Sequence, residues 1–97
     1  MLDPKTIVRQ APRVAFRGLA EGEGGVLLNL DSAQYHSLNA VGAAIWELAA
    51  TGPSLESLIR DLRVKVDDAP EDLENDVDEF LGQLAERGLV ELEDQAG

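Results

Sequence analysis

The fold of this chain follows from one stretch, Asp31-Ser-Ala-Gln-Tyr-His-Ser-Leu-Asn-Ala-Val-Gly-Ala-Ala-Ile-Trp-Glu-Leu48, in which a strand leads through a short cap into a helix. Asp31 and Ser32 are turn formers that can hydrogen-bond their own backbone. They therefore predict a hairpin that joins a strand over residues 26–30 to a strand over residues 34–38.

A helix is predicted to begin after Asn39, whose short amide can accept from the free N–H groups of a first helical turn. Apolar residues then recur at helical spacing, which gives this helix one face for burial; they are Val41, Ala44, Ile45 and Leu48, with Trp46 beside them. Gly52 and Pro53 are expected to end the helix, because glycine relaxes its C-terminus and proline cannot continue it.

The residues before this stretch predict further strands. Residues 13–17 alternate polar and apolar side chains, which places Val14 and Phe16 on one face of a half-buried strand. Residues 6–9 form either a short additional strand or only an arm. The glycine-rich residues 21–25 are expected to be a flexible hairpin loop, since they lack the spacing and the lysine of a phosphate-binding loop.

The residues after it predict two more helices and a short extended end. Ser54 is a natural N-cap for a helix over residues 55–62. The last helix is expected to begin near Pro70 and to run to about Arg87, with Gly88 as its C-terminal cap. Its apolar stripe comprises Leu73, Val77, Phe80, Leu81 and Leu84. Three strands followed by three helices indicate an α+β, winged-helix-like domain, with residues 89–92 extended behind it.

Length and composition restrict the class of protein. The chain has 97 residues and is expected to form one domain over residues 1–97, with an acidic tail from about residue 91. It contains no cysteine, which excludes disulfides and thiolate zinc sites and fits a reduced cytoplasmic setting. No apolar run approaches the roughly 20 residues of a membrane span. His36 is the only histidine, so neither a metal nor another cofactor is expected.

The net charge of −11 belongs entirely to the region from Asp67 onward, which holds 12 acidic residues and one basic residue, Arg87. A solvated helix face followed by an acidic tail explains this charge, and attraction of a basic partner is the alternative. Both interpretations argue against nucleic-acid binding, because phosphate binding relies on clustered Lys and Arg.

Two patterns in this sequence resemble the PqqD family. The first is Leu28-x-Leu30-Asp31-x-x-x-Tyr35-x-x-Leu38-Asn39-x-x-Gly42-x-x-Ile45-Trp46-x-Leu48, and the second is Asp76-Val77-x-x-Phe80-Leu81-x-x-Leu84-x-x-x-Gly88-Leu89. The family is named after the peptide chaperone of pyrroloquinoline quinone biosynthesis, and its members are also called RiPP recognition elements. The resemblance spans about residues 26–89 and implies the winged-helix-like PqqD fold, a three-stranded antiparallel sheet followed by a three-helix bundle.

Short free-standing members of this family with the same core most resemble the leader-recognition proteins of lasso-peptide pathways. The resemblance implies a non-catalytic adaptor that binds the leader of a ribosomally made precursor peptide and delivers it to a separate leader peptidase and to a cyclase. In the family the leader adds as an extra strand to an open sheet edge, here residues 34–38, beside the last helix, here residues 70–87. Backbone pairing then supplies register, and side-chain pockets supply choice.

The predicted leader-binding residues lie on these two elements. They are Gln34, Tyr35, His36, Ser37 and Leu38 on the strand, and Leu73, Asp76, Val77, Phe80 and Leu84 on the helix. Of these, Leu84 is expected, together with Leu81, to pack against the first helix, whereas Val77 and Phe80 face either the core or the groove. Asp76, Asp78 and Glu79 form an acidic rim that would steer a basic leader. Because an open edge also permits self-pairing, we expect a monomer or a weak edge-strand dimer.

Three other functions are less well supported by the residues. The chain could serve as the peptide chaperone of another pathway of this kind, such as that of pyrroloquinoline quinone. A winged-helix DNA-binding regulator would need a basic recognition helix, whereas residues 70–87 are strongly acidic. A hydrolase would need a Cys–His pair, which this chain cannot form, or a triad built around His36 without a nucleophile elbow.

Overall fold

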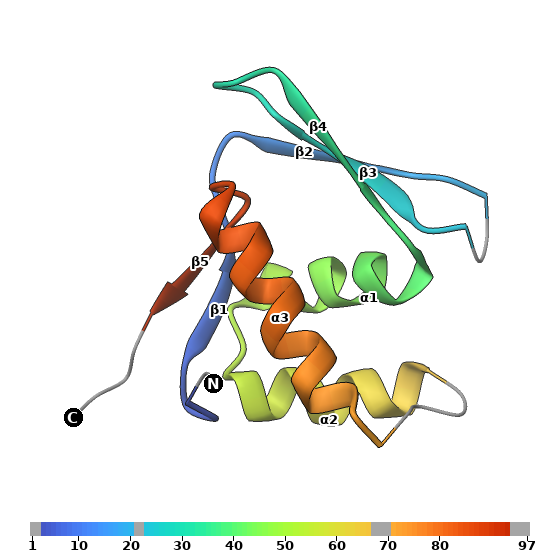
Figure 1. Ribbon diagram of the computed structural model, residues 1–97, viewed down its shortest axis with the longest axis vertical. Helices are drawn as coiled ribbons and strands as arrows, with labels where there is room; N and C mark the ends of the chain where they lie inside the picture. Colours follow the sequence, from blue (N-terminus) through green and yellow to red (C-terminus); the bar gives the residue numbers. More distant parts are fainter. Residues whose placement is uncertain (1–2, 21–22, 67–70, 94–97) are drawn as a thin grey trace.

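A computed structural model describes residues 3–20, 23–66 and 71–93 of the chain. Within these ranges the protein forms a three-stranded antiparallel sheet, three α-helices and a separate two-stranded ribbon (Figure 1). The predicted α+β class and its element order are therefore confirmed. The sheet has the order β2–β3–β4, built from β2 (Val14–Gly18), β3 (Gly25–Asn29) and β4 (Gln34–Leu38).

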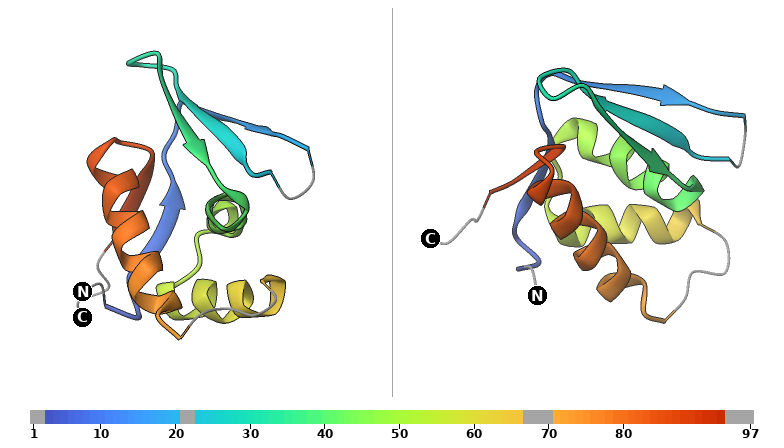
Figure 2. Two further views of the ribbon diagram at one scale, coloured as in Figure 1. Left: turned by 45° about the vertical axis from the view of Figure 1, so that its right-hand side comes forward. Right: turned by 45° about the horizontal axis from the view of Figure 1, so that its top comes forward.

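The helices lie beneath this sheet. They are α1 (Ala40–Leu48), which continues into the short 3₁₀ turn η1 (Ala49–Thr51), then α2 (Leu55–Lys65) and α3 (Leu73–Glu86). Figures 1 and 2 show α1 below the sheet and α2 below α1, and in Figure 1 α3 crosses in front of both helices. Each layer contributes to one continuous hydrophobic core, whose largest fully buried side chains are Leu27, Leu58, Leu62, Leu81, Leu84, Val8 and Val77.

Local capping explains where the helices begin and end. Asn39 is the N-cap of α1, and its side chain accepts from the N–H of Gly42 at 2.8 Å. Ser54 is the N-cap of α2, and its hydroxyl oxygen accepts from the N–H of Ser57 at 3.3 Å. Gly88 follows α3 in the left-handed conformation with φ 73°, as the cap of a terminating helix requires. All three sequence predictions are confirmed.

The bounds of two helices differ from the predicted ones. α3 begins at Leu73 rather than near Pro70, because Glu71 and Asp72 form a turn and Asp72 has the non-helical dihedrals φ −87° and ψ 15°; Pro70 itself lies outside the described residues. α2 runs one turn further than predicted, to Lys65. The basic residues of this last turn complement the negative end of the helix dipole.

The short strand predicted over residues 6–9 is a real strand and not a free arm. It is β1 (Ile7–Gln10), which pairs antiparallel with β5 (Val90–Glu93) in a two-stranded sheet. Val8 is fully buried at its centre, and the N–H of Val8 donates to the carbonyl oxygen of Pro53 at 2.9 Å. The two ends of the described chain are therefore tied together behind α3 (Figure 2).

Candidate functional site

The candidate site is built around the outer side of β4, one of the two edge strands of the sheet. β4 pairs with β3 on one side only, so among the described residues its other side is an open sheet edge. Figures 1 and 2 show this edge on the side of the sheet that faces α3. An open edge carries unpaired backbone N–H and C=O groups that can bind a further extended chain.

The hydrogen-bond pattern identifies which groups face outward. The N–H of Leu30 donates to the carbonyl oxygen of Arg13, and the N–H of Leu19 donates to that of Gly24, both at 2.9 Å. Backbone groups alternate in direction along a strand, so even-numbered residues of β3 point toward β2 and odd-numbered ones toward β4. The odd-numbered residues of β3 pair with Gln34, His36 and Leu38 of β4, whose backbone groups therefore point toward β3. The backbone groups of Tyr35 and Ser37 are therefore directed to the open edge.

An apolar hollow of about 290 Å³ lies beyond the C-terminal end of β4, where α1, α2 and α3 meet. The ring of Phe80 is half-buried at its wall, and Asp76 is exposed at its rim. The remaining lining residues are mostly aliphatic: Asn39, Val41, Gly42, Ile45, Val66, Leu73 and Val77. A hollow of this composition can accept an apolar side chain from a bound peptide.

A second, much smaller hollow lies at the other end of β4, beside the C-terminus of α3. It is lined by Asn29, Gln34, Tyr35, His36, Arg87 and Leu89. The two hollows thus lie near opposite ends of β4, and Figure 1 shows α3 running antiparallel to β4. We call the surface that joins the two hollows, from Arg87 to Phe80 beside the open edge of β4, the edge groove.

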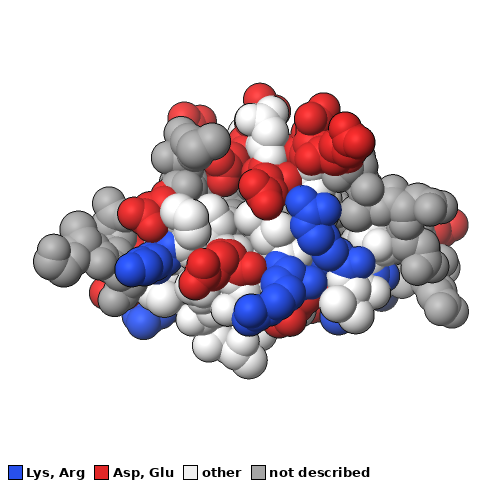
Figure 3. Space-filling model, turned by 90° about the horizontal axis from the view of Figure 1, so that it is seen from below, with Lys and Arg blue, Asp and Glu red and all other residues white. Residues whose placement is uncertain are grey.

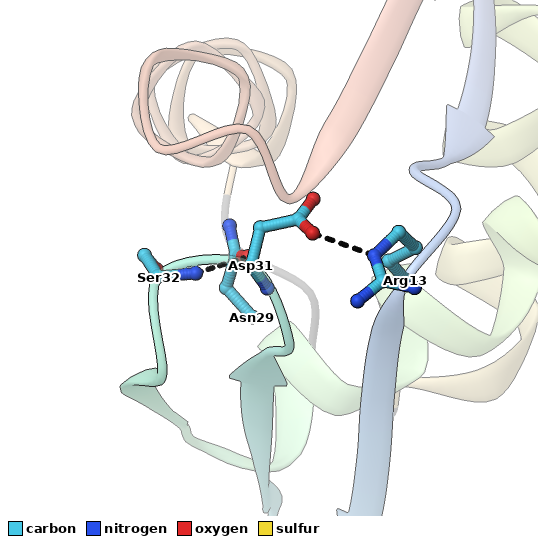
Figure 4. A network of polar contacts seen from close by, with 4 residues as sticks. All are labelled: Arg13, Asn29, Asp31 and Ser32. Carbon is cyan, nitrogen blue, oxygen red and sulfur yellow. Dashed lines mark hydrogen bonds and ion pairs between the residues drawn. The ribbon is translucent and has the colours of Figure 1, made fainter.

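Asn29 fixes the Arg87 end of the edge groove. Its side-chain oxygen accepts from the N–H groups of Asp31 at 2.9 Å and Ser32 at 3.2 Å, and its Nδ2 donates to the backbone oxygen of Arg87 at 3.4 Å. One amide therefore closes the β3–β4 turn, as Figure 4 shows, and also contacts the C-terminal end of α3. The predicted hairpin over Asp31 and Ser32 is confirmed, but the Asp31 carboxylate accepts from Nε of Arg13 at 2.6 Å instead of closing the turn.

His36 lies on the inner side of β4 at this end of the groove. Burial, and in second place the positive charge of Arg87, lower the pKa of His36 below its ordinary value of 6.5. The imidazole is therefore neutral at neutral pH, with one nitrogen as hydrogen-bond donor and the other as acceptor. The described residues contain no group of three His, Asp or Glu side chains that could hold a metal ion.

The predicted site residues divide into two groups in the structure. Gln34, Tyr35 and Ser37 are exposed on β4, Tyr35 at 73 %, while His36 and Phe80 are half-buried. Leu38, Leu73, Val77 and Leu84 are buried, with exposed fractions between 0 and 4 %. Leu73 and Val77 nevertheless line the apolar hollow, whereas Leu84 lines neither hollow and packs in the core.

Sequence reasoning missed several residues of the groove. Asn29 and Arg87 belong to it through a contact between positions 58 residues apart, which no local pattern reveals. Gly42 was visible only as part of a family pattern, although its missing side chain makes room for Phe80. The aliphatic residues Val41 and Ile45 were assigned only to the buried face of α1.

Charge is distributed unevenly over α2 and α3. Seen from below (Figure 3), acidic side chains gather along the border of this face where α3 begins, and Lys and Arg lie among them over α2. Arg87 is the one basic residue among the described residues 71–93, which also contain nine acidic residues. No helix in the described part of the chain is both long and apolar enough to cross a membrane.

An open strand edge next to a helix, with an apolar hollow at one end, defines a small domain that can capture an extended peptide by strand addition. The profile of the PqqD family, described as Coenzyme PQQ synthesis protein D, matches residues 24–90. The chain therefore belongs to the PqqD family.

Two solved structures are similar over most of their length. One is TbiB1 in complex with the TbiA(beta) leader peptide, which is 28 % identical with a TM-score of 0.73, over 86 % of this chain and 94 % of that one. The other is lasso peptide synthetase B1 complexed with the leader peptide, which is 25 % identical with a TM-score of 0.70, over 87 % of this chain and 96 % of that one. A search of curated proteins gave no significant match.

Proposed function

We propose that this protein is a non-catalytic adaptor that binds the leader segment of a ribosomally made precursor peptide in the edge groove and presents it to a separate leader peptidase and a cyclase of a lasso-type pathway. The observation that carries the proposal is the open edge of β4, with the backbone groups of Tyr35 and Ser37 directed outward. The similarity to two leader-peptide complexes supports the same function.

The free energy of binding requires both the open edge of β4 and the apolar hollow at Phe80. The outward groups of Tyr35 and Ser37 can form four backbone hydrogen bonds, at about 1 kcal/mol net each. Ordering about five residues of a flexible peptide costs about 1–2 kcal/mol per residue, so backbone pairing alone gives no useful affinity. An apolar side chain that is fully buried adds about 1.5–3 kcal/mol. The hollow at Phe80 is where we place this anchor.

Strand addition can be tested by a pair of substitutions at one exposed position. Ser37→Pro removes an N–H that faces the open edge and leaves the pairing with β3 intact, and proline is tolerated on edge strands. Ser37→Ala changes the side chain only and is the matched control. The probe is fluorescently labelled TbiA(beta) leader peptide, together with leader segments of other lasso-type precursors, titrated by fluorescence polarisation.

We expect saturable binding that is weakened about tenfold or more by Ser37→Pro and is unchanged by Ser37→Ala, with circular dichroism showing both variants folded. Equal affinities of the two variants would show that the peptide does not add to β4. If no leader segment of the panel binds to the folded protein, leader recognition itself is refuted.

A second candidate function is favoured by the description of the matching family profile, which concerns coenzyme PQQ synthesis. In this alternative the edge groove holds the precursor peptide of that pathway instead of a lasso-type leader. Adding this precursor to the titration panel decides between the two, because the cognate peptide is expected to bind most tightly.

A further inference from the structure

The Arg87 end of the edge groove differs in charge from the rest of α3. The other charged residues of this helix are all acidic, namely Glu74, Asp76, Asp78, Glu79 and Glu86. Arg87 follows them as the C-cap, and its backbone oxygen accepts from Nδ2 of Asn29. The backbone of Arg87 is thereby held beside the start of β4, and the residue lines the small hollow.

The guanidinium of Arg87 is available for a ligand. Four other cations pair with carboxylates, in the pairs Arg9–Glu93, Arg13–Asp31, Arg63–Glu74 and Lys65–Glu47. Arg87 has no such ion pair within the described ranges. Its neighbour His36 is neutral at neutral pH, because burial and Arg87 itself lower the pKa of the imidazole. Arg87 is therefore the only full charge among the residues that line this hollow.

The surrounding charge makes this cation selective. A peptide carboxylate placed at the other end of the groove meets Asp76 at the rim of the apolar hollow and is repelled, and like-charge contacts of this kind suppress wrong registers. At Arg87 the same carboxylate can accept a charge-assisted hydrogen bond, and arginine can donate two in parallel. An acidic side chain is thus accepted at one end of the groove and disfavoured at the other, which also fixes the register of the peptide.

We propose that Arg87 selects an Asp or Glu side chain of the bound peptide, located two or four positions from the apolar side chain that fills the hollow at Phe80. The spacing follows from strand geometry. His36 and Asn39, which line the two hollows, are three residues apart, or about 10 Å along an extended chain. Side chains on one face of a strand recur every second residue, so the spacing is even. This inference rests on the proposed function and names the peptide class that the groove takes.

The test uses a phage-displayed library of random peptides, so that the natural ligand need not be known. The library is selected separately on the wild-type protein, on Arg87→Glu and on Arg17→Glu. Arg17 is the matched control, because it is an exposed arginine of β2, the strand at the opposite edge of the sheet from β4. A selected peptide is then titrated against each protein by fluorescence polarisation, with its acidic residue intact and replaced by Lys.

We expect wild type and Arg17→Glu to select Asp or Glu two or four positions from an apolar residue, and Arg87→Glu to select Lys or Arg there. We also expect Arg87→Glu to bind the wild-type peptide about tenfold more weakly and to recover affinity for the Lys peptide. Selected peptides that keep the apolar anchor but show no acidic preference would overturn the role of Arg87 and leave the proposed function standing. Failure to select any peptide whose binding is lost in Ser37→Pro would overturn both.

Discussion

The ring of Phe80 packs directly against the backbone of Gly42, so that a Cβ atom on residue 42 would lie 3.1 Å from Cζ of Phe80. The same Cβ would lie 3.3 Å from the side-chain oxygen of Asn39, which caps α1. The absence of a side chain at Gly42 therefore lets a ring of α3 and the cap of α1 meet at the wall of the apolar hollow. This contact links the stability of the fold to the shape of the groove.

We predict that Gly42→Ala destabilises the protein and weakens peptide binding. Alanine in a helix is worth up to about 1 kcal/mol over glycine, but here the Cβ displaces the ring of Phe80 or the capping amide. Gly82→Ala is the matched control, because its Cβ would meet nothing within 4 Å. In urea unfolding we expect Gly82→Ala to raise the free energy of unfolding by about 0.5–1 kcal/mol and Gly42→Ala to lower it. An equal gain in both variants would disprove the packing argument.

Asn29 is predicted to contribute more to stability than the neighbouring ion pair. Asn29→Ala removes three hydrogen bonds, to the backbones of Asp31, Ser32 and Arg87, and is expected to cost about 1–2 kcal/mol. Asp31→Ala removes the exposed pair with Arg13 and is expected to cost less than about 0.5 kcal/mol. Chemical denaturation of both variants measures their free energies of unfolding. A larger loss of stability in Asp31→Ala than in Asn29→Ala would show that the ion pair, and not Asn29, stabilises this turn.

The elements and their caps could be predicted from the sequence because their signals are local. Asn39 and Ser54 each cap a helix by accepting from an N–H three residues later, so the sequence alone indicates where these helices begin. Gly88 indicates the end of α3 because glycine readily adopts a positive φ. The start of α3 was misplaced because a proline and three acidic residues suit a turn as well as a first helical turn. The pairing of β1 with β5 has no local signal, since it joins residues 80 or more positions apart.

The candidate site could be predicted only as two elements. Strand 34–38 and the last helix follow from pattern and family resemblance, but the pattern cannot tell which apolar residues of an amphipathic helix line a groove. Val77, Phe80 and Leu84 belong to the same apolar stripe of α3. Only Val77 and Phe80 line the hollow, whereas Leu84 is completely covered by the core. The role of Arg87 depends on Asn29, and this contact exists only in the folded chain.

His36 is predicted to make stability depend on pH. Its pKa in the folded protein lies below 6.5, whereas in the unfolded chain it takes up a proton near 6.5. Between these values the unfolded state binds more protons, so the free energy of unfolding falls as the pH drops below 6.5 and is unaffected above it. Comparing wild type with His36→Gln in urea at about pH 7.5 and about pH 5.5 isolates this effect from the carboxylates. We expect a smaller loss on acidification in the variant, and an identical loss would contradict the burial of His36.

The β1–β5 ribbon is predicted to stabilise the whole domain even though it lies outside the edge groove. Val8 is fully buried between the ribbon and the helices, so Val8→Ala is expected to cost about 2 kcal/mol through lost contacts and a cavity. The adjacent Arg9→Ala removes an exposed ion pair with Glu93 and is the matched control, with an expected cost below about 1 kcal/mol. For a domain of this size, a loss of 2 kcal/mol lowers the melting temperature by about 8–16 °C, which calorimetry can resolve. Because the groove does not touch Val8, peptide affinity measured well below the melting temperature should be unchanged in both variants. A Val8→Ala protein that melts like Arg9→Ala would show that the ribbon is not part of the cooperative core.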